Sequence, residues 1–321
     1  MKKNSVFFTV LLILLVLGLA LSNSAMAKYP EKPIVLTVSY APGGSTDVAA
    51  RAMVPFLEKY LGGTVVVKNY PGAGGQVGWT KLARSKADGY TIGYINLPSL
   101  NMVYTARKGV AFHPVKSFDP IGCNIIDPNT VLVRRDDDRF KTIHDLINAA
   151  KKEPGKIVCA ADGPLSDDQL AFVRIAKETG TKFTFVSYSG SAKSQAALLG
   201  GHADFTISNT FDVIKYKDKE RCLVQLWNER YHMNPDTPTF KEAFGKELIG
   251  ASTRAVAAPA GVPADRLNAL RDAFKKMAND PAYLARAKKI GLTLAWMDHN
   301  QLGSFLQDLQ STVESLIDEL K

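Results

Sequence analysis

Small polar residues and glycines gather in two short loops near the start of the chain. Residues 41–47 read Ala-Pro-Gly-Gly-Ser-Thr-Asp, and residues 71–75 read Pro-Gly-Ala-Gly-Gly. Each loop follows an apolar run that predicts a strand and precedes a run that predicts a helix. Glycine lets the backbone approach a bound group closely, and the first helical turn has free N–H groups at the positive end of its dipole. The two loops therefore predict a site for a carboxylate oxygen.

Neither loop has the sequence of a nucleotide site. The Gly-Lys-Ser/Thr ending of a phosphate-binding loop and the G-x-G-x-x-G pattern are both absent from them. A glycine-rich turn without a ligand is the alternative for either loop alone. Their recurrence in consecutive strand-helix units favours binding. Ser45 and Thr46 are expected to add hydroxyl donors, whereas Asp47 suits the start of its own helix.

Two later loops are expected to form the opposing jaw of the same site. Residues 161–168 read Ala-Asp-Gly-Pro-Leu-Ser-Asp-Asp, and residues 187–191 read Ser-Tyr-Ser-Gly-Ser. Ser166, Ser189 and Ser191 either cap helices or contact the ligand. Asp167 and Asp168 either stabilise their own helix start or, if they face the cleft, suit a ligand with an amine or hydroxyl group as well as a carboxylate.

The sequence contains no constellation that predicts catalysis or a bound metal. The five histidines are dispersed, without metal spacing and without a nucleophile motif. The formal net charge of +9 comes from scattered lysines and arginines, which suits attraction of small anions. No basic stripe interleaved with aromatic residues predicts nucleic-acid binding. We expect a binding protein without enzyme activity, cofactor or metal.

The order of elements predicts an α/β protein of two lobes. Apolar runs alternate with amphipathic runs from residue 34 onward, which is typical of βαβ units. Strands are expected at 34–40, 64–69, 90–96, 121–126, 130–134, 156–161, 183–188, 203–209 and 254–258. Helices are expected at 45–61, 76–85, 142–152, 166–179 and 192–199, and from about 263, 281 and 299. Pro55 is expected to kink the first helix or to loosen one of its turns.

The first 27 residues are expected to be a cleaved secretory signal. Lys2 and Lys3 precede an apolar run over 10–21 and an Ala-x-Ala ending at Ala27. A transmembrane anchor is the alternative, but the apolar run is short for a span. We predict cleavage after Ala27 and a periplasmic protein.

Cys123, Cys159 and Cys222 allow at most one internal disulfide, and a bridge between Cys123 and Cys222 is conceivable.

The loops fall into a known order. Residues 29–34, 41–47 with Arg51, 67–75, 88–91, 187–191, 199–204 and 258–263 closely resemble the tripartite tricarboxylate transporter receptors, or Bug receptors. The resemblance implies a two-lobed periplasmic binding protein, a venus-flytrap of type II with two interdomain crossovers. Residues 28–122 and 224–321 would form lobe 1, and residues 123–223 lobe 2. Relatives hold dicarboxylates, tricarboxylates, aromatic acids or acidic amino acids on the two glycine loops.

The resemblance also implies the partners. A monomer would deliver its ligand to membrane permease subunits of a tripartite transporter, or present its closed form to a sensor kinase. Relatives usually have a Gly-Ser-rich stretch and a histidine where this chain has residues 162–168, which puts a simple dicarboxylate in doubt. The expected ligand-binding residues are Tyr40, Pro42, Gly43, Gly44, Ser45, Thr46, Asp47, Ala73, Gly74, Gly75, Asn96, Ser166, Asp167, Ser189, Ser191 and Asn209.

Overall fold

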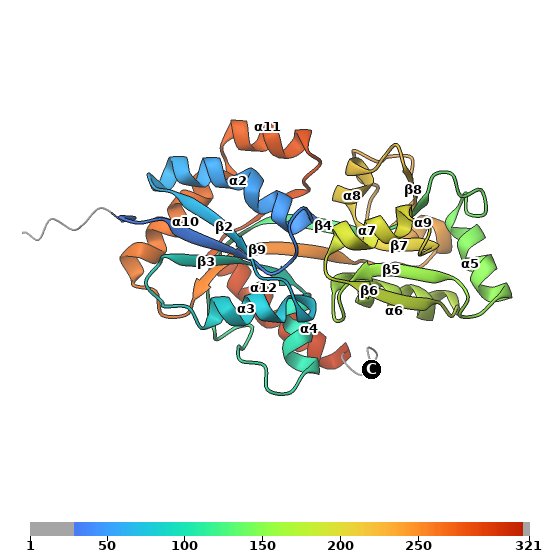
Figure 1. Cartoon of the computed structure of the whole chain (residues 1–321), viewed down its shortest axis with the longest axis horizontal. Helices are drawn as coiled ribbons and strands as arrows, with labels where there is room; N and C mark the ends of the chain where they lie inside the picture. Colours follow the sequence, from blue (N-terminus) through green and yellow to red (C-terminus); the bar gives the residue numbers. More distant parts are fainter. Residues whose placement is uncertain (1–28, 317–321) are drawn as a thin grey trace, which may run out of the picture.

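The computed structural model describes residues 29–316, which form two α/β lobes joined side by side (Figure 1). One sheet of ten strands runs through both lobes. The expected cleavage site at Ala27 lies outside the described residues. In the described part, no helix combines the length and apolar character that a membrane crossing requires.

The first lobe contains both glycine loops and the last helices of the chain. Its strands are β1 (Ile34–Val38), β2 (Val65–Asn69), β3 (Thr91–Leu97), β9 (Ala251–Pro259) and β10 (Leu294–Met297). Its helices are α2 (Ser45–Leu61), the 3₁₀ turn η1 (Ala73–Gly75), α3 (Gln76–Ala83), α4 (Ser99–Ala106), α10 (Ala264–Ala278), α11 (Pro281–Lys289) and α12 (His299–Leu316). β1 pairs in parallel with β2 and β3, so the loops that follow β1 and β2 start from the same edge of the sheet.

The second lobe repeats the arrangement with fewer helices. Its strands are β5 (Val158–Asp162), β6 (Thr184–Tyr188), β7 (Phe205–Asn209) and β8 (Glu220–Gln225). Its helices are α5 (Ile143–Lys152), α6 (Asp167–Thr179), α7 (Ser191–Leu199), α8 (Thr210–Lys215) and α9 (Phe240–Phe244). α5 and α9 begin with capping boxes, because Thr142 and Thr239 each exchange hydrogen bonds with the acidic residue three positions on.

A single long strand connects the lobes. β4 (Phe118–Arg134) pairs with β9 over 118–128 and with β7 over 129–133, so one strand belongs to both lobes. The sheet has the strand order β2-β1-β3-β9-β4-β7-β5-β6, and β8 and β10 also pair with β4. The sequence predicted two strands here, at 121–126 and 130–134, because the intervening Asp-Pro-Asn reads as a break. The chain returns to the first lobe along β9. Two crossovers are therefore confirmed.

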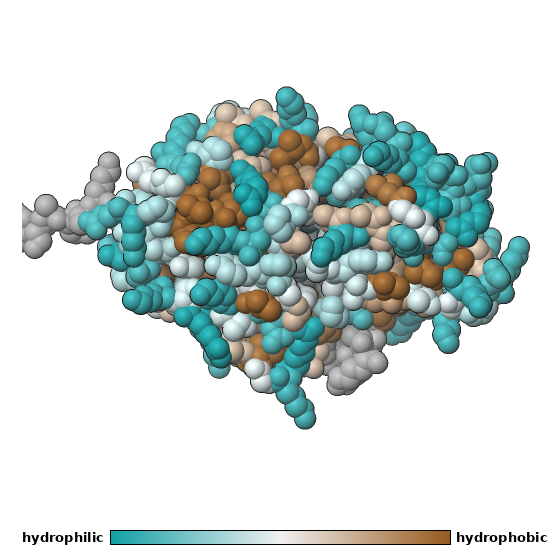
Figure 2. All heavy atoms as spheres, viewed as in Figure 1, coloured by the Kyte–Doolittle hydropathy of each residue, from teal (hydrophilic) through white to brown (hydrophobic). Residues whose placement is uncertain are grey.

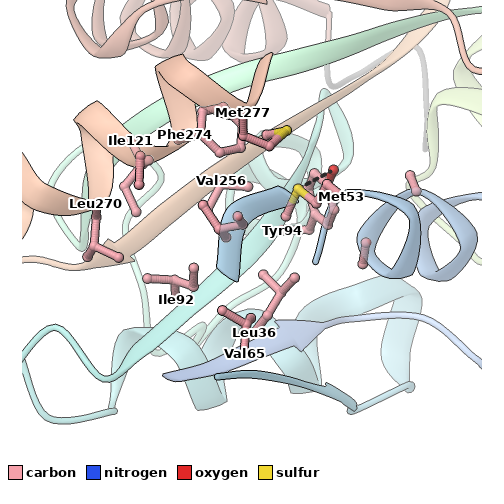
Figure 3. Packing of buried hydrophobic residues seen from close by; sticks show 14 of the residues in the cluster. Leu36, Met53, Val65, Ile92, Tyr94, Ile121, Val256, Leu270, Phe274 and Met277 are labelled. Atoms are coloured by element: carbon pink, nitrogen blue, oxygen red, sulfur yellow. Dashed lines mark hydrogen bonds between the residues drawn. The ribbon is translucent and has the colours of Figure 1, made fainter. Parts of the chain in front are cut away.

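Each lobe has its own hydrophobic core. In the first lobe, α2 and α10 cover one face of the sheet, and Met53, Val256 and Phe274 pack together from the three elements (Figure 3). The opposite face is covered by α3, α4 and α12, around Trp79 and Leu306. β1 is largely buried on both faces, and four of its five residues are apolar, with Thr37 as the exception.

The core of the second lobe includes residues beyond the expected boundary. Leu226, Phe240 and Leu248 pack with Phe205 in this core. We therefore propose that the return to the first lobe occurs at β9 and not at residue 224. Short helices after 209 and 239 carry few apolar positions, which is why α8 and α9 were missed. The same holds for α4 and for the edge strand β10.

Two further expectations concern Pro55 and the cysteines. α2 runs unbroken from Ser45 to Leu61 with Pro55 inside it. The three cysteines are free thiols within residues 29–316, so the conceivable Cys123–Cys222 bridge is wrong. Cys222 on β8 pairs with Leu132 on β4. Leu132 follows Cys123 by nine residues on β4, which separates these two residues by about 30 Å in an extended strand. A disulfide needs Cα atoms within about 7 Å.

Candidate ligand-binding cleft

The first glycine loop lies directly against the second lobe. Gly44 is the N-cap of α2, and a Cβ built on it would lie 3.4 Å from Ser191 Oγ. The Ser45 N–H donates to the same Ser191 hydroxyl over 3.2 Å. Lys215 Nζ of the second lobe donates to the Gly43 carbonyl oxygen over 3.2 Å. The two lobes therefore meet at the start of α2, and we call this contact the seam.

The first turn of α2 supplies hydrogen-bond donors at the seam. The N–H groups of Thr46 and Asp47 have no acceptor within the helix, because the first turn lacks a preceding turn. The Thr46 hydroxyl accepts from the Asn96 side-chain amide over 3.0 Å, and both residues are buried. Free N–H groups and the helix dipole together favour an anionic oxygen here.

The second glycine loop contributes close packing more than free donors. The N–H groups of Gly75 and Val77 both donate to the Gly72 carbonyl oxygen, so the loop satisfies them internally. Gly74 has φ +61°, and a Cβ on it would lie 2.5 Å from the Pro164 carbonyl oxygen. A Cβ on Gly163 would likewise lie 3.0 Å from Gly74 Cα. The sequence predicted two equivalent helix starts, whereas the loops differ in their use of backbone N–H groups.

A small cavity of about 240 Å³ lies beside this second contact. It is lined from the first lobe by Ser39, Tyr40 and residues 72–75, and from the second by residues 163–164 and 187–189. Ser39 is buried, and its hydroxyl has no hydrogen-bond partner in the described part of the chain. Both lobes therefore line this cavity, and Ser39 adds a buried hydroxyl to its wall.

Arg254 is the central cation of the seam. Its side chain is 1% exposed, and one terminal nitrogen forms a 2.9 Å ion pair with Asp127, which is 0% exposed. The other terminal nitrogen donates to Ser45 Oγ over 2.9 Å and to Asn209 Oδ1 over 3.2 Å. One guanidinium thus joins the first glycine loop, the crossover strands and the second lobe.

The second lobe faces the seam with a cluster of carboxyl groups. Asn129 Nδ2 donates to Asp167 Oδ2 over 2.8 Å and to Asp168 Oδ1 over 3.0 Å. Asn209 Nδ2 donates to Asp167 over 3.2 Å, and Asp168 accepts from the Asp162 N–H over 3.1 Å. Burial raises the pKa of the Asp162 and Asp168 carboxyl groups well above the usual range, and the neighbouring Asp167 adds to both shifts.

Several residues expected in the site have other roles. Asp47 accepts from the Gly43 N–H over 2.9 Å and from Arg51 and Asn69, so its carboxylate holds its own loop together. Ser166 caps α6 by accepting from the Gln169 N–H over 3.1 Å. Pro42, Gly43, Ala73 and Ser189 are exposed at the rim. The seam brings together Gly44, Ser45, Thr46, Asn96, Asp167, Ser191 and Asn209. Tyr40, Gly74 and Gly75 lie at the second contact between the lobes.

Sequence reasoning missed Arg254, Asp127 and Asn129, and it included Asp162 in the opposing jaw without assigning it a contact. A signal for Arg254 was present, because one arginine interrupts the small and apolar run 251–258. A charge in such a strand is buried, and buried charges are paired. Asp127, the ion-pair partner of Arg254, lies 127 positions earlier in the chain, and no local sequence pattern identifies it. Among the described residues, no group of histidine, cysteine and acidic side chains is arranged to hold a metal ion.

The carboxyl cluster predicts that stability falls as pH rises. The folded state holds protons on Asp162 and Asp168 at pH values where the unfolded chain, with ordinary carboxyl pKa values near 4, has released them. For each such carboxyl group, the free energy of unfolding falls by up to about 1.4 kcal/mol for every pH unit above pH 4, until the pH reaches the raised pKa of the folded state. Asp168→Asn should flatten this slope in urea titrations from pH 4 to 8. An unchanged slope would show that Asp168 ionises normally.

Comparison with known proteins decides the family. Residues 49–321 match the sequence profile described as tripartite tricarboxylate transporter family receptor. The chain belongs to this receptor family. The match covers both lobes and the crossovers, so the resemblance found in the loops extends over most of the chain. The receptor is thus a solute-binding protein and not an enzyme.

Individual relatives agree with this assignment. The receptor is 30% identical over 308 residues to the UPF0065 protein in the gbd 5' region of Cupriavidus necator, covering 95% of this chain and 93% of the relative. It matches the structure of the periplasmic binding protein BugD with a TM-score of 0.85 at 27% identity, over 91% and 98% of the two chains. R. palustris Rpa4515 with adipate shares the fold, with a TM-score of 0.85 at 23% identity over 91% and 98%. The two-lobed periplasmic binding-protein fold is confirmed.

Proposed function

We propose that the receptor binds a small organic carboxylate at the seam and delivers it to the membrane permease of a tripartite transporter. The ligand classes that we expect are dicarboxylates, tricarboxylates, aromatic acids and acidic amino acids. The observation that supports this most is the start of α2, where free N–H groups, the Ser45 hydroxyl and the helix dipole meet the second lobe. The assignment of individual residues to the ligand site is part of this proposal.

The hydrogen bonds at Ser45 support a role as donor to the ligand. Ser45 Oγ accepts from Arg254, so its own O–H remains available for an anionic oxygen. Ser191 Oγ accepts from the Ser45 N–H, which leaves the Ser191 O–H available on the opposite lobe. Arg254 is neutralised by Asp127 and therefore acts through Ser45 without adding a net charge to the seam.

Closure of the lobes explains how binding is transmitted. A ligand held between α2 and α7 contacts both lobes only in the closed form, so its binding energy shifts the equilibrium toward closure. Motion is expected about β4 and β9, the two strands that connect the lobes. The closed surface is then what a permease would recognise.

A carboxylate screen followed by one glycine variant tests the proposal. We expect at least one mono-, di- or tricarboxylate to raise the melting temperature, and Gly44→Val to weaken its calorimetric affinity at least 30-fold. The valine methyl groups would meet Ser191, while the backbone at φ −74° tolerates valine.

Gly303→Val is the matched control, since a Cβ there has nothing within 4 Å. It should keep full affinity. Unchanged affinity in Gly44→Val would remove the first glycine loop from the site, and a screen without any stabilising carboxylate would contradict the ligand class.

A further inference from the structure

A second cavity lies beside the crossovers, on the flank that α6 and α12 cover. Its volume is about 330 Å³, and both lobes line it. Leu97 and Leu309 contribute from the first lobe, Leu170 and Ala171 from the second, and Trp227 and Ile249 from the segment before β9. Figure 1 shows α12 passing below the junction of the two lobes, toward α6. The walls are largely apolar, and we call this space the hinge cavity.

Two buried acceptors lie at the inner end of the hinge cavity. Asn129 is 0% exposed and uses its side-chain N–H₂ group on Asp167 and Asp168. Its Oδ1 atom is buried, lacks a hydrogen-bond partner among residues 29–316, and belongs to a residue that lines the cavity. Asp167, 8% exposed, lines the same end. A buried carbonyl oxygen without a donor costs roughly 1–3 kcal/mol, so this end is suited to a donor.

The charges around the hinge cavity favour a cationic donor at the inner end. The Asp167 carboxylate lines this end, and Arg254, the nearby cation, is already paired with Asp127 and so does not neutralise it. The other charged residue that lines the cavity is Arg174, whose guanidinium donates to the Ile249 carbonyl oxygen over 2.6 Å. Arg174 follows Asp167 by seven residues on α6, which separates them by about 10 Å along the helix axis. Arg174 therefore lies near the mouth.

We propose that the hinge cavity is a binding site for a small primary amine with an apolar body. The ammonium group would donate to the Asp167 carboxylate and to Asn129 Oδ1, and its apolar part would lie against Leu170, Ala171 and Leu309. Trp227 adds an aromatic wall of the kind that organic cations favour. This site lies away from the glycine loops, although Asp167 also contacts Asn209 at the seam, and its occupant needs no carboxylate. Because both lobes line it, an occupant would also favour the closed form.

Calorimetry with two matched probes tests the proposal. Hexylamine and hexan-1-ol have similar size and apolar area, but only the amine is charged at pH 7. We expect hexylamine to bind the wild-type receptor about tenfold to a hundredfold more tightly than hexan-1-ol, the range of a charged hydrogen bond. Asp167→Asn should reduce this ratio to threefold or less. Glu178→Gln, a change on the exposed face of α6, should leave the ratio unchanged.

A second variant tests the cavity without altering the acidic cluster. Leu309→Trp would place an indole ring inside the hinge cavity beside its apolar wall, and we expect it to weaken both probes at least tenfold while carboxylate binding at the seam is preserved. Equal affinity of the two probes for the wild-type receptor would overturn the proposal. So would an amine preference that survives Asp167→Asn, or full hexylamine affinity in Leu309→Trp.

Discussion

Arg254→Met is expected to lower the free energy of unfolding by about 3–5 kcal/mol. The change leaves the Asp127 carboxylate buried at 0% exposure without its cation, and removes the donor to Ser45 and Asn209. Methionine fills a comparable volume, so the loss comes from the unpaired charge and the lost hydrogen bonds more than from a void. Urea unfolding at pH 7, followed by circular dichroism, measures it.

The double variant Arg254→Met with Asp127→Asn separates charge from shape. Asparagine removes the buried negative charge and still accepts from the Phe211 N–H, which donates to Asp127 over 3.3 Å. We expect the double variant to recover more than half of the lost stability. A single variant that loses less than about 1 kcal/mol, or a double variant that is less stable than the single one, would refute the central role of this ion pair.

Gly74→Val is expected to reduce carboxylate affinity at least 100-fold while both lobes stay folded. Its Cβ would lie 2.5 Å from the Pro164 carbonyl oxygen, and backbone atoms on the opposite lobe cannot move aside as a flexible side chain can. Closure would therefore be blocked at the second glycine loop. Calorimetry with the carboxylate found by screening gives the affinity.

Gly62→Val controls for the strain of a side chain at positive φ. Gly62 has φ +67°, close to the +61° of Gly74, but nothing lies within 4 Å of its built Cβ. Both variants should lose about 1–2 kcal/mol of stability from the left-handed backbone. Only Gly74→Val should lose affinity. Equal affinities in the two variants would show that the lobes do not need this contact to close on the ligand.

Features with local causes were predictable from the sequence. The glycine loops, the start of α2 at Ser45 and the alternation of strands and helices each depend on neighbouring residues, namely turn glycines and short apolar runs. The expected N-cap was Ser45 or Thr46, whereas Gly44 takes that position without a side-chain hydrogen bond. The position of both glycine loops at one sheet edge followed from the parallel order of β1, β2 and β3. The second-lobe residues Ser191 and Asn209 were also placed at the contact with the first lobe.

Features that depend on distant residues were not predictable. Arg254 meets Ser45, which is 209 positions away, and Asp127, which is 127 positions away, and no local pattern encodes either contact. The second glycine loop resembles the first in sequence, yet its Gly72 carbonyl oxygen accepts hydrogen bonds from the Gly75 and Val77 N–H groups. At the start of a helix, such N–H groups would be free. Phe240 and Leu248 pack in the core of the second lobe although they follow its last strand, and no local pattern in the sequence indicates this packing.

A crystal structure of the receptor with the carboxylate that gives the largest thermal shift tests the central claim most directly. We predict carboxylate oxygens within about 2.7–3.2 Å of the Thr46 or Asp47 N–H, with Ser191 contacting the same group from the second lobe. A carboxylate bound away from the first turn of α2, or one that contacts a single lobe, would contradict the account.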